Sequence, residues 1–292
     1  MSAVARLDTL AGARPEWTAW LRVVREVAAE LSNPAWDAGP PRTAQAADLA
    51  PLLAGAALRP DARAVARLLE RLTGIARAQG LQALAGDAGR EQASADEALA
   101  LFLASVNGDH AALDLRASRT GASPEGLRAL AQLLPMPYLH ACARRWAARG
   151  EPRWSQGYCP VCGVWPAFAE VRGVERSRHL RCGRCGAGWP MPVLACTYCA
   201  TTDHETLGTL VVDGTKSRFA LDVCRGCSGY LKSFTTLQAT PSDEILAADL
   251  ESVEFDLAAV ERGFLRPPGP GAALHASIAV AADAAPSASR RW

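Results

Sequence analysis

Eight of the nine cysteines in this sequence lie between residues 159 and 227, in four Cys-x-x-Cys pairs. Two thiolates separated by two residues bind one metal ion from a single turn, and two such turns complete a tetrahedral four-sulfur site. One pair is weak evidence for a metal site, but four pairs at this spacing are strong evidence. The candidate ligands are Cys159, Cys162, Cys182, Cys185, Cys196, Cys199, Cys224 and Cys227.

The segments between the pairs indicate which pairs share an ion. Nineteen residues (163–181) separate the first pair from the second, and 24 residues (200–223) separate the third from the fourth. Either segment can hold a β-hairpin, and the second contains Asp213-Gly214, which is typical of a type I′ turn. We therefore expect sequential pairing, first with second and third with fourth. Cross-bracing of the first with the third and the second with the fourth is the alternative.

The ligand set limits the chemistry of these sites. Four sulfurs suit zinc and rubredoxin-type iron, so either metal satisfies the pattern. A four-sulfur site is coordinatively closed, which leaves no position for water or substrate. We therefore expect no catalytic residues and no small-molecule substrate. Each ion is expected to stabilise folding by about 10 kcal/mol. A thioredoxin-like redox function is disfavoured because it requires one pair in a βαβ context.

Charge disfavours a nucleic-acid partner. The 292 residues include 31 Lys and Arg and 30 Asp and Glu, for a net charge of +1. The cysteine-rich region carries a net charge of +2, which becomes −2 once eight thiolates and two divalent ions are counted. Such a module has little general attraction for phosphate backbones.

Targeting signals are also not expected. Arg6, Asp8 and Arg14 interrupt any signal-like apolar run near the start. No stretch approaches the roughly 18 apolar residues of a spanning helix. The sequence therefore predicts a cytoplasmic protein without membrane contact, in which a disulfide framework is not expected.

The elements that must position the cysteines change in character near residue 152. Before it, apolar residues recur at helical spacing and predict a bundle. The predicted helices span 15–31, 43–58, about 61–75, about 91–106, 124–134 and 137–148. After it, alternating segments predict short strands at 178–182, 207–212 and 219–223. A brief helix is expected at 249–262.

These patterns predict an α+β protein, with an N-terminal all-helical domain followed by two small rubredoxin-like or zinc-ribbon β-hairpin modules. The predicted helical domain spans 1–152. The two four-cysteine modules span 153–194 and 195–265, and the second includes the short helix. The Ala, Ser, Pro and Gly content of 266–292 predicts a disordered tail.

The cysteine-rich half resembles the formate dehydrogenase accessory protein family, FdhE. The resemblance rests on Tyr158-Cys-Pro-Val-Cys-Gly163, on Leu180-Arg-Cys-Gly-Arg-Cys185 followed by Trp189, on Cys196-Thr-Tyr-Cys199, and on Cys224-Arg-Gly-Cys227 running into Gly229-Tyr-Leu-Lys232. The segment from Asp256 to Phe264 is similar to the family's ending. Before residue 150 the likeness is general, and after Phe264 the sequence departs from the family.

The resemblance implies a cytoplasmic assembly factor rather than an enzyme. Members of the family contact the catalytic, molybdopterin-bearing subunit of formate dehydrogenase, which needs them to become active. The eight cysteines then act as metal ligands in rubredoxin-like sites, which suggests iron. Two alternatives stay open: a rubredoxin-like one-electron carrier and a zinc-ribbon nucleic-acid-binding module.

Overall fold

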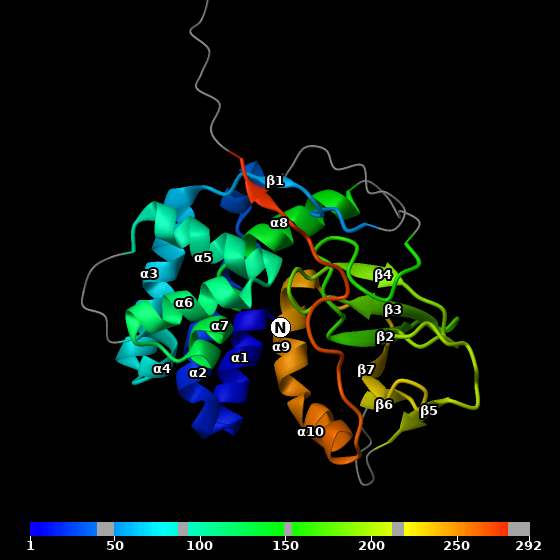
Figure 1. The fold of residues 1–292 in the computed structure, drawn as a ribbon. Coiled ribbons are helices and arrows are strands. Elements are labelled where there is room, and N and C mark those ends of the chain that lie inside the picture. The colour runs from blue at the N-terminus through cyan, green and yellow to red at the C-terminus, as the bar shows by residue number, and fades with distance from the viewer. Residues whose placement is uncertain (40–49, 87–92, 149–153, 212–218, 280–292) are drawn as a thin grey trace, which may run out of the picture.

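The computed structural model describes residues 1–39, 50–86, 93–148, 154–211 and 219–279. Helices gather on one side of the molecule and a sheet lies on the other (Figure 1). The predicted fold class is therefore confirmed. The helices of the first half are α1 (Ala3–Ala13), α2 (Thr18–Glu30), α3 (Ala62–Ala78), α4 (Gln82–Ala85), α5 (Ala95–Asn107), α6 (His110–Thr120), α7 (Pro124–Leu133) and α8 (Met136–Ala147).

Polar caps fix where several of these helices begin. The Asp61 carboxylate accepts hydrogen bonds from two amides in the first turn of α3, and the Ser123 hydroxyl caps α7 just before Pro124. Ser94 and Glu97 form a reciprocal capping box at the start of α5. Such caps satisfy amides that have no partner inside the helix. The predictions of α2, α3, α5, α7 and α8 are confirmed, whereas α1, α4 and α6 have no counterpart among the predicted helices.

The predicted helix at 43–58 is wrong over the part that the structure describes. Residues 43–49 lie outside the described residues, and 50–56 form turns that lead into the short strand β1 (Ala57–Leu58). Gly55 adopts a positive φ of 66°. The amides of Leu52 and Leu53 donate to Pro160 and Val161 of the cysteine-rich half rather than to an i−4 carbonyl. Tertiary hydrogen bonding thus outweighs the helical spacing.

Six strands form one sheet in the order β4-β3-β2-β7-β6-β5. Each half of the sheet contains an antiparallel hairpin that precedes a cysteine pair, β2–β3 before the second pair and β5–β6 before the fourth. The parallel pairing of β2 with β7 joins the two halves. The boundary between modules at 194 and 195 stays a prediction. The strands are β2 (Phe168–Arg172), β3 (Ser177–Arg181), β4 (Gly188–Pro190), β5 (Leu207–Leu210), β6 (Phe219–Cys224) and β7 (Gly229–Thr236).

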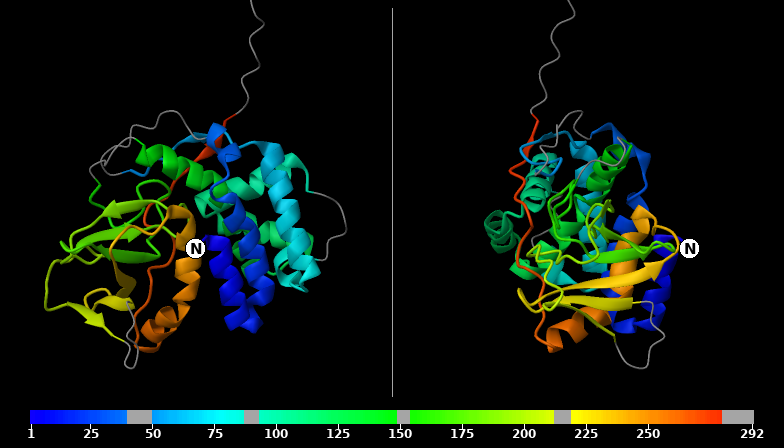
Figure 2. Two further views of the ribbon diagram at one scale, coloured as in Figure 1. Left: turned by 180° about the vertical axis from the view of Figure 1, so that it is seen from behind. Right: turned by 90° about the vertical axis from the view of Figure 1, so that its right-hand side faces the viewer.

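Helices α9 (Ile245–Glu251) and α10 (Val253–Glu261) lie between α1 and the sheet (Figure 2). The Arg6 guanidinium of α1 forms ion pairs with the carboxylates of Glu244 and Glu251. A short helical stretch in this region was predicted, and the structure places it across the junction of the two halves.

The prediction of disorder after residue 266 is wrong for residues 266–279. This segment starts on the sheet half, where Arg266 donates to the Ala167 carbonyl, and crosses to the helical half. It ends there in β8 (Ser277–Ile278), which pairs in parallel with β1. The Asn107 side chain holds the backbone of Ala276 through two hydrogen bonds of 2.9 and 2.8 Å. Composition alone cannot report such pairing, because its partners are distant in sequence. Residues 280–292 lie outside the described residues.

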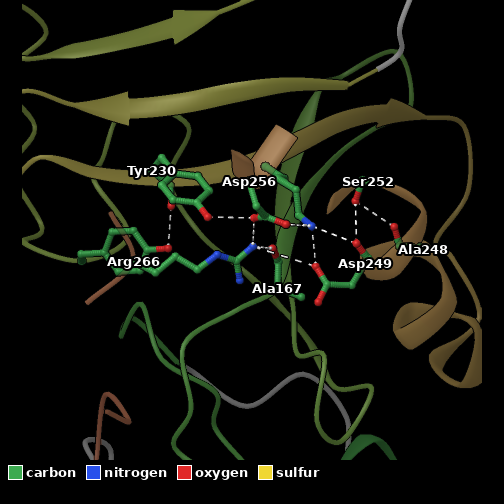
Figure 3. A network of polar contacts seen from close by, with 9 residues as sticks. Ala167, Tyr230, Ala248, Asp249, Ser252, Asp256 and Arg266 are labelled. Carbon is green, nitrogen blue, oxygen red and sulfur yellow. Dashed lines mark hydrogen bonds and ion pairs between the residues drawn. The ribbon is translucent and has the colours of Figure 1, made fainter. Parts of the chain in front are cut away.

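A polar network connects the sheet to α9 and α10, and Figure 3 shows Asp249, Asp256, Tyr230 and Arg266 within it. The Lys232 side chain on β7 is fully buried, and its ammonium lies 2.6 Å from an Asp249 carboxylate oxygen and 2.7 Å from an Asp256 oxygen. The Arg266 guanidinium and the Tyr230 hydroxyl both donate to the other Asp256 oxygen, at 2.8 and 2.9 Å. Burial of a charge is costly unless it is paired, so this network fixes α10 on the sheet.

One continuous hydrophobic core spans both halves. It runs from α1 and α2 through α8 to Trp154, Leu180 and Trp189 of the sheet half. The same cluster includes all four cysteines of the first two pairs. Across the described residues, no helix combines the length and the apolar character needed to cross a bilayer.

Candidate metal centres

The structure brings the eight cysteines together in the two quartets expected from sequential pairing. In each quartet, one sulfur from every residue lies within 4.8 Å of the others. The alternative, cross-braced pairing does not match these positions. We call the groups the first quartet and the second quartet. The first comprises Cys159, Cys162, Cys182 and Cys185, and the second comprises Cys196, Cys199, Cys224 and Cys227.

The sulfur spacing fits a tetrahedral metal ion. In the first quartet, Cys159–Cys185 and Cys162–Cys182 sulfurs are each 3.5 Å apart. The corresponding pairs of the second quartet are separated by 3.7 and 3.8 Å. Four sulfurs at about 2.3 Å from a central zinc would be about 3.8 Å apart. Both quartets could therefore hold an ion of this size, and the geometry leaves open whether it is zinc or iron.

Local backbone geometry shapes each cysteine turn. The amide of Val161 points at the Cys159 sulfur, and the amide of Tyr198 points at the Cys196 sulfur, both at 3.4 Å. Such N–H groups stabilise thiolate charge. Each turn is followed by a residue at positive φ. The four are Gly163, Gly186, Ala200 and Ser228, with φ of 71°, 72°, 57° and 54°.

The first quartet requires glycine after its cysteine pairs for a second reason. A Cβ at Gly163 would lie 2.5 Å from the Ala272 carbonyl oxygen, and one at Gly186 would lie 2.6 Å from the Ser242 carbonyl oxygen. The backbone of other segments thus packs directly on these turns. Ala200 and Ser228 carry the same left-handed conformation without glycine, which costs about 1–2 kcal/mol at each position.

The helical half covers the first quartet on one side. The amides of Leu52 and Leu53 donate to the carbonyls of Pro160 and Val161, at 2.7 and 3.2 Å. Pro160 and Val161 lie between the two cysteines of the first pair. The turn that carries half of the first quartet is therefore held by a segment that precedes it by about a hundred residues in sequence.

Two further hydrogen bonds enclose the first quartet. The Arg184 guanidinium, within the second cysteine pair, donates to the Ser105 carbonyl of α5 at 2.6 Å. The amide of Ala272 in the C-terminal segment donates to the Gly163 carbonyl at 3.0 Å. The first quartet consequently lies at the junction of the helical half, the sheet and the C-terminal segment, and all four of its cysteines are buried.

The second quartet is open to solvent on one side. Cys196 and Cys224 are buried, but Cys199 and Cys227 are exposed. The quartet's second cysteine pair lies at the turn between β6, which ends at Cys224, and β7, which begins at Gly229. The two centres share ligand type and spacing but differ in how much protein surrounds them.

Aromatic rings connect the two quartets. Trp165 makes edge-to-face contacts with Tyr158, beside the first quartet, and with Tyr198 of the second, at centroid distances of 6.0 and 5.2 Å. Trp154 and Trp189 are buried and donate to main-chain carbonyls through their indole N–H groups. Trp154 and Trp189 therefore fill the core.

Protonation controls ion binding in the buried quartet. Burial raises the pKa of the Cys159 and Cys185 thiols well above their usual value. A metal ion must displace those protons, because the thiolate is the ligand. Ion binding at the first quartet would therefore release protons, and its affinity would increase as pH rises.

Comparison with known proteins yields one consistent group of relatives. The chain is 32% identical over 117 residues to a "Protein FdhE homolog" of Stutzerimonas stutzeri. The alignment covers 39% of this chain and 37% of that protein. A homologue from Pseudomonas aeruginosa is 33% identical over 118 residues, and one from Aquifex aeolicus is 28% identical over 152 residues. These matches span 38% and 52% of those relatives, so the chain aligns with only part of their length. No family model matches the chain.

A solved structure shares the fold across almost the whole chain. The crystal structure of the FdhE protein from Pseudomonas aeruginosa matches with a TM-score of 0.53 and 21% sequence identity, over 93% of this chain and 94% of that one. The resemblance to the FdhE family that the cysteine motifs indicate is thereby confirmed, locally by sequence and across the chain by fold.

Proposed function

We propose that this protein carries out the function of the FdhE family, as a cytoplasmic accessory factor that binds the catalytic subunit of formate dehydrogenase and is needed for its maturation. The observation that supports this most strongly is the agreement of fold and cysteine motifs with FdhE proteins. On this proposal the protein is not an enzyme. It acts by docking to its client.

We further propose that both quartets are occupied metal centres with the eight cysteines as ligands. A tetrathiolate ion supplies crosslinking of chain segments and, where the metal is iron, one-electron redox capacity. All four coordination positions come from cysteine, which leaves none for a substrate. The first centre would hold the helical half against the sheet, since the segments that meet around it come from residues 52–53, 105, 159–185 and 272.

Hairpins and backbone amides of the chain position these ligands. The hairpins β2–β3 and β5–β6 place the second and fourth pairs at strand ends, and the amides at Val161 and Tyr198 point toward sulfur. Ligands held by paired strands and tight turns favour a rigid framework over a mobile one. Rigidity suits a protein that presents a fixed surface to a partner.

Genetic complementation tests the proposed function. A strain that lacks its own FdhE protein and makes formate dehydrogenase is supplied with this chain, and formate-dependent dye reduction is measured. The proposal predicts restored activity and recovery of the catalytic subunit with an affinity-tagged chain. Unrestored activity together with no recovered dehydrogenase, from a chain shown to be folded and expressed, would contradict it.

The same preparation separates the two alternatives. An electron carrier would contain iron that a physiological donor reduces and an acceptor reoxidises, with activity lost when that couple is removed. A nucleic-acid module would shift DNA or RNA in a salt-dependent manner. The accessory function predicts neither behaviour as a requirement for dehydrogenase activity.

A further inference from the structure

The helical half contains a groove that neither the metal centres nor the fold accounts for. Helices α3, α5, α6 and α7 enclose a volume of about 1060 Å³, with α4 at one end. None of the eight cysteines lines it. Helix α3 forms one wall of the groove. Its lining residues Arg63, Arg67, Gly74 and Arg77 are spaced by four, seven and three residues, which places them on the same face of the helix.

The groove concentrates positive charge. Five arginines line it, against two carboxylates, for an excess of three positive charges in a chain whose net charge is +1. One of the carboxylates, Glu97, is already engaged by Arg116 at 2.6 Å and by the Ser94 amide. The five arginines are Arg63, Arg67, Arg77, Arg116 and Arg119.

Three of the five guanidiniums are available to a ligand. Arg63, Arg67 and Arg119 are exposed and form no ion pair with any residue in the described ranges. Within the described ranges, Arg77 donates one hydrogen bond, of 3.4 Å, to the Ala85 carbonyl. Guanidinium groups bind carboxylates in a bidentate manner and keep their charge at all physiological pH values.

The floor of the groove is apolar. Leu69, Leu101, Leu127 and Leu130 line it, the first three with 6 to 7% of their surface exposed and Leu130 fully buried. A ligand that fills this groove therefore meets hydrocarbon at its centre and positive charge along its rim. An amphipathic polypeptide with acidic residues beside apolar ones matches both features.

We propose that this groove is a docking site for an acidic, amphipathic segment of a partner polypeptide. Apolar side chains of the segment lie on the leucine floor, and its carboxylates pair with Arg63, Arg67 and Arg119. The proposal rests on the helical half alone and requires neither metal centre nor the proposed accessory function. A nucleic acid is disfavoured because no aromatic side chain lines the groove to stack on bases.

Fluorescence anisotropy with defined probes tests the proposal. The probe is a labelled helical peptide with Glu on one face and Leu on the other, and the control peptide replaces each Glu with Lys. We expect saturable binding of the acidic peptide that weakens with added salt, and no saturable binding of the basic one. The triple variant Arg63→Glu, Arg67→Glu, Arg119→Glu should weaken binding of the acidic peptide about tenfold or more.

A matched triple variant controls for overall charge. Arg22, Arg176 and Arg262 are exposed and do not line the groove, so their replacement by Glu changes net charge equally without touching it. Unchanged affinity in this control supports the proposal. Equal loss in both triple variants, absence of saturable binding, or tighter binding of single-stranded RNA than of the acidic peptide would overturn it. A dimer of the chain that only the groove variant dissociates would also overturn it, because the occupant would then be a second copy.

A steric variant separates the groove from its charge. A Cβ added at Gly74 meets no atom within 4 Å, so Gly74→Leu adds bulk inside the groove without a backbone clash. Gly12 of α1 is equally open and provides the matched Gly12→Leu control. We expect the Gly74 variant to weaken peptide binding while its thermal unfolding follows that of the control. Unaltered binding by a folded Gly74→Leu protein would count against occupancy of the groove.

Discussion

The two metal centres should release their ions at very different rates. The perturbation is an excess of a chromophoric chelator added to protein loaded with two equivalents of zinc. At the second quartet, the exposed Cys199 and Cys227 allow the chelator direct access. At the first quartet, every sulfur is buried, and access requires the helical half to separate from the cysteine turns.

The structure gives a size for this difference. Four hydrogen bonds described above close the first quartet: two from residues 52–53, one from Arg184 to Ser105, and one from Ala272 to Gly163. At about 1 kcal/mol each, local opening costs about 4 kcal/mol. That free energy corresponds to about a thousandfold slower release. We therefore expect one equivalent of zinc to appear rapidly and the second in a much slower phase.

Ligand substitution assigns the two phases. Cys199→Ser should abolish the rapid phase and leave the slow one, with the helical half still folded by circular dichroism. Arg184→Ala should speed the slow phase and leave the rapid one unchanged. Release of both equivalents in a single phase, or loss of the slow phase in Cys199→Ser, would refute the reasoning from burial.

Three further predictions concern stability. Ala200→Gly should raise the free energy of unfolding by about 1 kcal/mol, because glycine adopts a positive φ without strain. Gly163→Ala should lower the free energy of unfolding, because the added Cβ lies 2.5 Å from a carbonyl oxygen. Urea unfolding of both variants checks this, and equal effects would contradict it. Lys232→Met should lower the free energy of unfolding by about 3 kcal/mol, because it leaves two aspartates without their buried cation. Arg25→Met, which removes an exposed ion pair, should lower it by less than about 1 kcal/mol. A similar loss of stability in both variants would argue against the network. Burial alone would raise the pKa of the Glu30 carboxyl, but hydrogen bonds from an indole, an amide and a guanidinium lower it below 4.5. The contribution of Glu30 to stability is therefore present above pH 4.5 and is lost as pH falls through the pKa of Glu30 in the folded protein. Glu30→Gln should consequently reduce the loss of stability at acid pH. An unchanged acid limb of the stability curve would contradict this.

The cysteine pattern predicted the quartets well because its information is local. Each Cys-x-x-Cys turn specifies two ligands, and the hairpin-sized segments between pairs specify which turns meet. Helix caps such as Ser123-Pro124 are local for the same reason, and α7 begins where the sequence places it. The turn Asp213-Gly214 lies outside the described residues, although the flanking strands β5 and β6 pair as predicted.

Features that depend on distant partners could not be predicted in this way. The parallel pairing of β2 with β7 joins segments about 60 residues apart, and no local motif marks it. Residues 52–53 are not helical, despite the helical spacing of the sequence, because their amides donate hydrogen bonds to the carbonyls of Pro160 and Val161. The segment 266–279 is ordered by β1 and Asn107, although its composition favours disorder. The groove arginines come from two helices, α3 and α6, so their convergence appears only in the folded chain.

Native mass spectrometry of the chain, purified together with the catalytic subunit of formate dehydrogenase, tests the central claim most directly. The account predicts a complex that contains both polypeptides, in which this chain carries two metal ions and no other bound cofactor of its own. A folded chain that binds the subunit with neither quartet occupied, or a metal-loaded chain that never associates with the subunit, would contradict it.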